Sequence, residues 1–149
     1  MLYSEFMNEA IILAKKAEKH DDVPVGAVIV CDDKIIAKGQ NKREKSKNSL
    51  MHAEIIAIDE ACRYLNSKYL ENCTLFVTLE PCPMCAGAII NSRIKKVVFG
   101  AYDEKAGCFG GLTDFTQLDF NHKPQIIGGY MAQECAQVLT DFFEKLRNR

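Results

Sequence analysis

The chain has 149 residues, of which 48% are hydrophobic and 26% are charged, and its net charge is −1. This length fits a single domain, spanning residues 1–149, that can bury a core without disulfide cross-links, and the composition excludes a disordered chain. The near-neutral charge excludes a uniformly basic nucleic-acid-binding protein, and the longest apolar runs, Val25 to Cys31 and Ala86 to Ile90, are too short to span a bilayer.

Helical and strand patterns alternate along the chain. Apolar residues recur at helical spacing near the N-terminus, which predicts an amphipathic helix over residues 4–19. The apolar run at residues 25–31 predicts a buried strand, and Asp32-Asp33-Lys34 predicts a turn into a second strand. The elements expected next are a strand at 35–40, a polar loop at 41–49, a helix at 52–65, a strand at 74–78, a helix at 83–90, a strand at 96–99, a glycine-rich loop at 107–111, a strand at 125–127 and a helix at 131–146. This order, αββαβαββα, predicts an α/β domain with helices on both faces of the sheet.

The cysteines favour metal or thiol chemistry over a disulfide framework. The N-terminal residues lack a basic leader followed by an apolar stretch, so we do not expect a secretory signal. Without export, an odd number of cysteines is poorly explained by disulfides, and we expect a reducing, cytoplasmic location. The cysteines are Cys31, Cys62, Cys73, Cys82, Cys85, Cys108 and Cys135.

Two short motifs carry the chemistry that the sequence indicates, His52-Ala53-Glu54 and Pro81-Cys82-Pro83-Met84-Cys85. Each stands where a helix is expected to begin. A Cys-x-x-Cys pair in a first helical turn lets both sulfurs reach one metal ion, and a helix N-terminus favours thiolate over thiol. With His52 as the third ligand, Cys82 and Cys85 are expected to bind one catalytic zinc. Three protein ligands leave a fourth position for water, whose pKa zinc lowers to about 7.

Glu54 is a candidate for proton transfer beside this metal. When metal-bound water attacks the amino-bearing carbon of a nucleobase, the neighbouring ring nitrogen must gain a proton, and the departing amine must be protonated as well. Glu54 closely follows His52 and is placed to move these protons without binding the metal. The HxE and PCxxC motifs together are the signature of zinc-dependent nucleobase deaminases.

Two other interpretations of the cysteine pair stay open from the motifs themselves. A thioredoxin-like redox pair would explain the Cys-x-x-Cys motif but would leave His-Ala-Glu unexplained. A structural zinc would need a fourth ligand, which Cys62, Cys73 or Cys108 could supply if the fold brought one near. The joint presence of the two motifs favours the catalytic site.

Longer runs around these motifs resemble the bacterial tRNA-specific adenosine deaminases, a branch of the cytidine deaminase-like zinc deaminases. The similarity covers nearly the whole chain. The similar runs include residues 23–28, 39–41, 77–88, 92–94, 97–101 and 121–122. Three positions depart from the family pattern: Met51 stands where a small alanine is usual, and Phe109 and Gly111 replace small or hydroxyl residues of the glycine-rich loop.

The resemblance implies a three-layer α/β/α fold around a five-stranded mixed sheet, and a homodimer with active sites near the interface. The apolar helix from Ala86 to Ile90 would be buried there or in the core of its own chain. The implied reaction is zinc-dependent hydrolysis of the wobble adenosine of a tRNA anticodon to inosine. By the same resemblance, His52, Cys82 and Cys85 bind one zinc per chain, and Glu54 is the proton shuttle.

The resemblance also implies that Asn41 contacts the adenine base and that Asp103 lies near the nucleotide. Each has a structural alternative, because asparagine and aspartate often cap turns. The polar loop at 41–49 places basic side chains next to Asn41, and we expect them to bind phosphates of an anticodon stem-loop, although a solvated surface is the alternative.

Two rival functions use the same motifs. A free-base or nucleotide deaminase of the guanine, cytidine or dCMP type needs the zinc site but no anticodon contacts. A non-catalytic, zinc-stabilised RNA-binding subunit would keep the fold without turnover, although Glu54 would then have no evident use.

Overall fold

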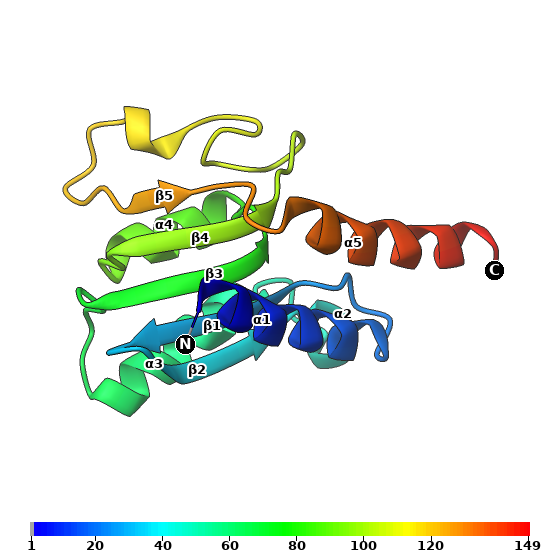
Figure 1. Cartoon of the computed structure of the whole chain (residues 1–149), viewed down its shortest axis with the longest axis horizontal. Helices are drawn as coiled ribbons and strands as arrows, with labels where there is room; N and C mark the ends of the chain where they lie inside the picture. The colour runs from blue at the N-terminus through cyan, green and yellow to red at the C-terminus, as the bar shows by residue number, and fades with distance from the viewer. Residues whose placement is uncertain (1) are drawn as a thin grey trace.

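The computed structural model describes residues 2–149. Within this range a five-stranded mixed sheet, in the order β2-β1-β3-β4-β5, lies at the centre of the molecule (Figure 1). The strands are β1 (Gly26–Cys31), β2 (Lys34–Gln40), β3 (Cys73–Leu79), β4 (Lys96–Ala101) and β5 (Gln125–Ile127). β1 pairs antiparallel with β2 and β3, whereas β3, β4 and β5 run parallel to one another. The five-stranded mixed sheet that the family resemblance implies is confirmed.

Helices cover both faces of this sheet (Figure 1). α1 (Tyr3–Glu18) and the start of α5 (Ala132–Arg147) pack on one face. α3 (Ala53–Leu65) and α4 (Pro83–Asn91) pack on the other. The expected three-layer α/β/α arrangement is therefore confirmed.

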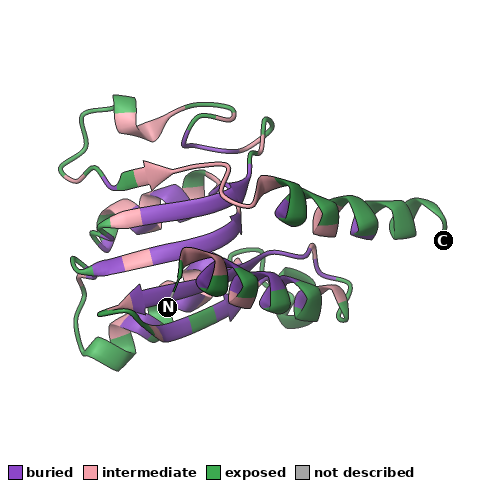
Figure 2. Cartoon of the chain, in the orientation of Figure 1, coloured by how far each residue is buried: buried purple, intermediate pink, exposed green. Residues whose placement is uncertain are grey.

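The central strand β1 shows why its sequence is apolar at every position. Ala27 and Ile29 pack in the cluster beneath α3, whereas Val28 and Val30 pack in the cluster beneath α1. Successive side chains of a strand point to opposite faces, so a strand covered on both sides needs apolar residues throughout. Figure 2 shows β1, β3 and β4 as the most continuously buried part of the chain.

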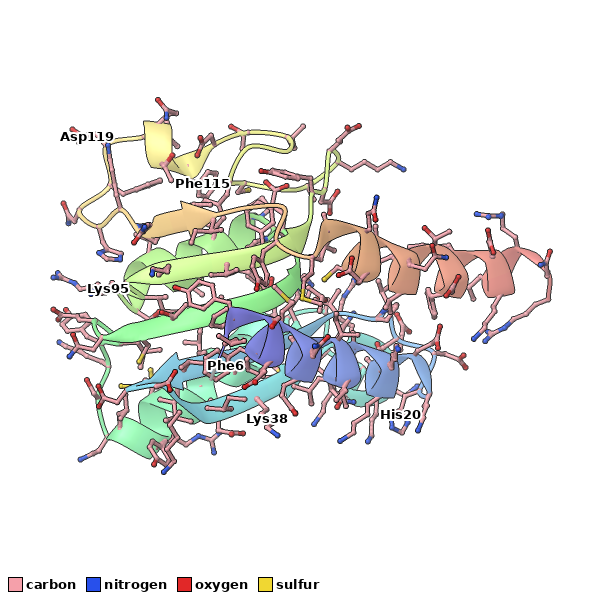
Figure 3. All side chains as sticks on the ribbon, viewed as in Figure 1. Phe6, His20, Lys38, Lys95, Phe115 and Asp119 are labelled. Carbon is pink, nitrogen blue, oxygen red and sulfur yellow. The ribbon has the colours of Figure 1, made fainter. Side chains whose placement is uncertain are left out.

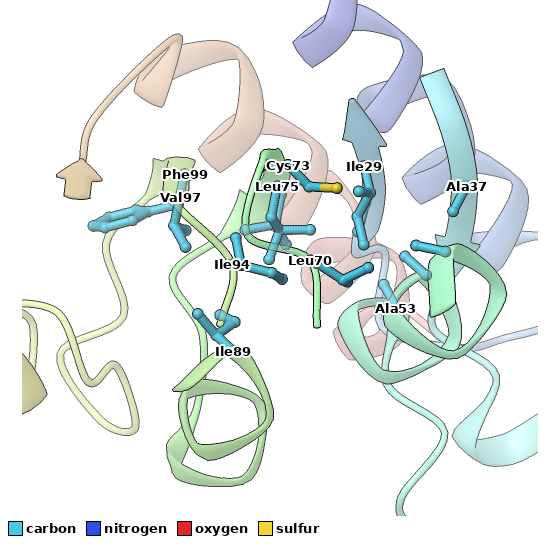
Figure 4. Close-up of a cluster of buried hydrophobic side chains, with 14 of the residues drawn as sticks. Ile29, Ala37, Ala53, Leu70, Cys73, Leu75, Ile89, Ile94, Val97 and Phe99 are labelled. Atoms are coloured by element: carbon cyan, nitrogen blue, oxygen red, sulfur yellow. The ribbon is translucent and has the colours of Figure 1, made fainter. Parts of the chain in front are cut away.

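Small residues let α3 lie close to the sheet. Ala53, Ala57 and Ala61 are fully buried where α3 packs on β1 and β2. Next to them, Ile89 of α4 packs with Leu75 and other side chains of the same cluster (Figure 4). This packing holds the first turns of α3 and α4 in place, and both turns carry the motif residues.

Aromatic contacts attach α1 to the opposite face. The ring of Phe76 lies 5.0 Å from that of Tyr3, edge-on, and 5.2 Å from that of Phe6. Phe6 lies on the sheet side of α1, whereas His20 is exposed beyond its C-terminal end (Figure 3).

Two elements were not expected from the sequence. The polar loop after β2 contains a four-residue helix, α2 (Arg43–Ser46), and a 3-10 turn, η1 (Phe115–Gln117), follows the glycine-rich segment. The carboxylate of Asp22 accepts hydrogen bonds from the N–H groups of Glu44 and Lys45, at 2.7 and 3.3 Å, and so stabilises the start of α2. Because α2 is stabilised by a side chain far away in the sequence and buries no apolar face, it has no apolar periodicity from which it could be predicted.

The parallel strands β3 and β4 end at the same edge of the sheet. There the N–H of Glu80 donates to the carbonyl of Ala101 at 2.9 Å. The segments that follow the two strands consequently lie side by side, at the edge where α/β folds commonly bind ligands. Among the described residues, no helix combines the length and apolar character needed to cross a membrane.

Candidate metal centre

Two helix starts bring the motif residues together. His52 is the N-cap of α3 and has extended backbone, with φ −76° and ψ 155°. Cys82 is the N-cap of α4, Pro83 occupies the first helical turn, and Cys85 follows in the same turn. Proline suits this position because the first helical N–H groups have no partner within the helix. The predicted helix starts are confirmed within a residue.

The side-chain atoms of these residues converge. The Nδ1 atom of His52 lies 3.6 Å from the Sγ atom of Cys82 and 3.5 Å from the Sγ atom of Cys85. The ligand atoms all lie within 4.8 Å of one another. For a tetrahedral ion with Zn–S of about 2.3 Å and Zn–N of about 2.0 Å, the N to S distance is about 3.5 Å. The arrangement therefore has the dimensions of a zinc site.

The two cysteines of the cluster differ in protonation. The hydrogen bond from the Cys85 thiol, with that from His52, lowers the pKa of Cys82 to about 4, although burial opposes the shift. The pKa of Cys85 is raised, first because its proton is shared with Cys82 and then by burial. The bond to Cys82 raises the pKa of His52. Cys82 is thus a thiolate at neutral pH, the form in which cysteine ligates metals.

A structural zinc with a fourth cysteine is not supported. In residues 2–149 the clustered ligand atoms belong to His52, Cys82 and Cys85. Cys62, Cys73 and Cys108, the residues considered as a fourth ligand, are not part of that group. The set therefore leaves one position of a tetrahedral ion for a small molecule.

Glu54 lies in the first turn of α3 and is 4% exposed. Its burial raises the pKa of the carboxyl group to about 7, with a smaller contribution from Cys82 and an opposing one from hydrogen bonds. A carboxyl group with this pKa both accepts and releases a proton near neutral pH, as general acid–base chemistry requires.

The cluster opens into a cavity of about 190 Å³. His52, Glu54 and Cys82 line it together with Asn41 and Asp103. The structure thus brings five of the six candidate site residues to the wall of one cavity, while the sixth, Cys85, is fully buried behind it. The remaining lining residues are Val23, Val25, Arg43, Ala53, Leu79, Glu80 and Ala106.

Asn41 has the contacts of a turn residue, and it also lines the cavity. Its side-chain Nδ2 donates to the carbonyl of Val23 at 3.1 Å, and its Oδ1 accepts from the N–H of Arg43 at 3.1 Å. These bonds hold the turn after β2. An amide carries two N–H donors and two acceptor lone pairs, so the side chain retains bonding capacity toward the cavity.

Asp103 is similar. Its Oδ1 accepts hydrogen bonds from the N–H groups of Lys105 at 3.0 Å and Ala106 at 3.2 Å, which is the contact pattern of a turn cap. The same residue lines the cavity. Its second carboxylate oxygen provides the acceptor capacity that a bound molecule would need.

One residue at this site, Glu80, was not predicted from the sequence. Glu80 is 2% exposed and lines the cavity. Its signal in the sequence was a carboxylate directly after an apolar strand and before Pro81, where a charge needs a specific partner. Arg43, one of the basic residues of the 41–49 loop, lines the cavity from the first position of α2.

Comparisons with known proteins agree with this geometry. The family model for the zinc-binding region of cytidine and deoxycytidylate deaminases matches residues 2–101. The tRNA-specific adenosine deaminase of Bacillus subtilis (strain 168) is 50% identical over 145 residues, covering 97% of this chain and 90% of the relative. That of Aquifex aeolicus (strain VF5) is 47% identical over 146 residues, covering 96% and 95%.

A solved structure has the same fold. It comes from a study of A-to-I editing by tRNA:A34 deaminases at the wobble position of transfer RNA. It superposes with a TM-score of 0.87 at 39% identity, covering 91% of this chain and 99% of the other.

Proposed function

The chain belongs to the zinc-binding deaminase family of the cytidine and deoxycytidylate deaminases, and within it to the tRNA-specific adenosine deaminases, and we propose that it converts the wobble adenosine of a tRNA anticodon to inosine. The reaction is hydrolytic: adenosine and water give inosine and ammonia. The observation that carries this proposal is the convergence of His52, Cys82, Cys85 and Glu54 at one cavity.

In this proposal His52, Cys82 and Cys85 hold one zinc ion per chain. The N to S distances of 3.5 and 3.6 Å and the thiolate character of Cys82 support the assignment. Zinc in such a site supplies the Lewis acidity that makes water available as a nucleophile near neutral pH. Pro83 and the packing of α4 hold the two sulfurs in place, so little reorganisation is needed on metal binding.

Glu54 transfers the protons of the reaction. Its carboxylate accepts a proton from the attacking water and delivers it to the adenine ring nitrogen next to the amino-bearing carbon. It then takes the proton of the hydroxyl group now on that carbon and transfers it to the departing amine, so that the carbonyl of inosine forms as the C–N bond breaks and ammonia leaves. Burial of Glu54 and its pKa of about 7 support this role, because both protonation states are accessible during turnover.

Asn41 and Asp103 are proposed to contact the nucleotide. Their bonds to neighbouring backbone hold both side chains at the cavity wall, so they need little ordering when a base enters. An adenine stacked in a duplex cannot reach such a recess, whereas an anticodon-loop nucleotide can be turned out of its stack at low cost.

The partner is proposed to be the anticodon stem-loop of a tRNA. Arg43 lines the cavity, Lys42 next to it is half-buried, and Lys45 and Lys47 are exposed in the same segment. Cations next to the recess would bind the phosphates that flank the reacting nucleotide.

The direct test measures inosine formation from a stem-loop with adenosine at the wobble position, with free adenosine, cytidine and guanine as competing substrates. We expect inosine in the stem-loop at the wobble position, and zinc near one ion per chain in the same sample. Turnover of free bases or nucleosides alone would favour the rival small-molecule deaminase, and zinc without any turnover would favour a non-catalytic RNA-binding subunit.

A homodimer remains part of the proposal. α4 buries Cys85, Ala86 and Ile89 in the core of its own chain, whereas Gly87 and Ile90 on its other side are half-buried. The core-packing alternative therefore accounts for one face of α4 and leaves the other for a second copy. Light scattering of the purified protein would give the molar mass of a dimer, and a monomeric mass would contradict this part of the proposal.

A further inference from the structure

Glu80 is a buried carboxylate that the proposed chemistry does not use. It follows the last residue of β3 and precedes Pro81, and it is 2% exposed. No basic side chain accompanies it among its hydrogen-bond partners in residues 2–149. A charge in such a position requires other compensation, because burial of an uncompensated carboxylate is very costly.

Backbone N–H groups supply that compensation. The Oε1 atom accepts from the N–H of Asp103 at 2.9 Å, and the Oε2 atom accepts from the N–H groups of Phe109 and Gly111, both at 2.8 Å. All three donors belong to the segment after β4, which we call the 103–111 loop. Hydrogen bonds to a charged acceptor are about twice as strong as neutral ones. The carboxylate therefore holds the two ends of this loop together.

Two glycines of the loop leave the space that the same carboxylate occupies. A Cβ atom on Gly107 would collide with the carboxyl group of Glu80, and one on Gly111 would collide with its Oε1 atom and with the carbonyl of Asp103. The glycine at position 111, a departure from the family pattern, thus has a structural reason in this chain: no larger residue fits between Glu80 and Asp103.

The loop forms part of the cavity wall. Asp103 and Ala106 line the cavity, as Glu80 itself does. The N–H of Cys108 also bonds to the carbonyl of Pro81 at 3.0 Å, so the loop is tied to the segment that carries Cys82. The position of this wall relative to the metal ligands therefore depends on Glu80.

We propose that Glu80 is a positioning residue for substrate recognition. It holds the 103–111 loop so that Asp103 and Ala106 form a fixed wall of the cavity, and it acts on substrate affinity without touching the reacting atoms. This inference rests on the proposed deaminase function for its kinetic readout.

The test compares two variants that disturb the contact between Glu80 and the 103–111 loop, one from each side. Glu80→Gln replaces one acceptor oxygen by an NH₂ group that faces backbone donors. Gly111→Ala leaves Glu80 intact and pushes against it from the loop, so it decides the question if Glu80→Gln fails to fold. Asp114→Asn is the matched control, because Asp114 also accepts a backbone N–H, that of Thr116 at 2.9 Å, but does not line the cavity.

For Glu80→Gln and Gly111→Ala we expect KM for the stem-loop to rise on the order of tenfold, the effect of losing one charged hydrogen bond, with kcat changed much less. Zinc content should equal that of the wild type. Hydrogen exchange should be faster in peptides covering the 103–111 loop and unchanged in α3. The control should keep the wild-type KM.

Three outcomes would overturn the inference: wild-type KM in both variants despite faster exchange, which would make Glu80 merely structural; a loss of zinc; or unchanged exchange in the loop. Failure of the proposed function is distinguishable, because the wild-type protein would then not form inosine. In that case exchange tests the hold of Glu80 on the loop by itself: a faster rate in Glu80→Gln supports that hold, and an unchanged rate contradicts the inference.

Discussion

The Nδ1 atom of His52 lies 3.5 Å from the Sγ atom of Cys85, although 33 residues separate them in the chain. The contact joins the start of α3 to the first turn of α4, and both helices pack in one core cluster. Because these residues lie at the starts of two helices that pack in the core, the fold itself holds His52, Cys82 and Cys85 close together.

Replacement of Glu54 by glutamine should remove turnover and leave metal binding intact. Glutamine keeps the shape of the side chain but cannot move a proton, and positioned general acid–base groups contribute roughly 10²- to 10⁴-fold to rate. We expect kcat on the stem-loop to fall by about this factor, with zinc content at the wild-type level. Activity within a few-fold of wild type would disprove the assignment of Glu54 as the proton shuttle.

Replacement of Cys82 by alanine should abolish both zinc binding and deamination. Two remaining ligands bind the ion far more weakly than three, so metal analysis after dialysis should show little zinc. A chelator should likewise inactivate the wild-type protein, and added zinc should restore it. Cys62→Ala is the control, because Cys62 lies outside the ligand cluster, and it should retain zinc and activity. Equal zinc in the Cys82 variant would refute the ligand set.

Combined replacement of Lys42 and Arg43 by alanine should weaken stem-loop binding and flatten its dependence on salt. Each phosphate contact that is lost reduces the slope of log K against log salt by about 0.7 on single-stranded nucleic acid. Titrations at several salt concentrations would measure both effects.

Lys15 and Lys16 provide the control for that experiment, because they are exposed near the end of α1, outside the cavity lining. Their double alanine variant removes the same charge and should bind as the wild type does. If the two double variants behaved alike, the segment around α2 would have no special place in the interface.

Replacement of Phe76 by alanine should lower the free energy of unfolding by about 3–5 kcal/mol, as expected for the loss of a fully buried ring. Phe76 is fully buried and contacts the rings of Tyr3 and Phe6, so α1 would lose its main anchor on the sheet. Chemical denaturation would measure the change. Tyr64→Ala removes a ring that is 56% exposed and should cost far less; a similar loss in both variants would contradict the core assignment.

Much of the fold was predictable because its signals are local. Apolar periodicity marks α1 and α5, and the run before the turn at Asp32 marks β1; the observed bounds differ from the expected ones by only a few residues. β5 was predicted at its observed bounds. The metal cluster was predictable for the same reason, since Cys82 and Cys85 lie in one helical turn and the HxE motif places Glu54 beside His52.

The contacts between segments far apart in the chain were decided by the tertiary structure alone. Asp22 stabilises α2 from 22 residues away, and Glu80 holds the N–H of Gly111 from 31 residues away. Neither contact leaves a periodic trace, because the donors are backbone N–H groups, which every residue except proline carries. The amino-acid sequence thus determined which residues carry the chemistry, and folding decided which loops form the wall of the cavity around them.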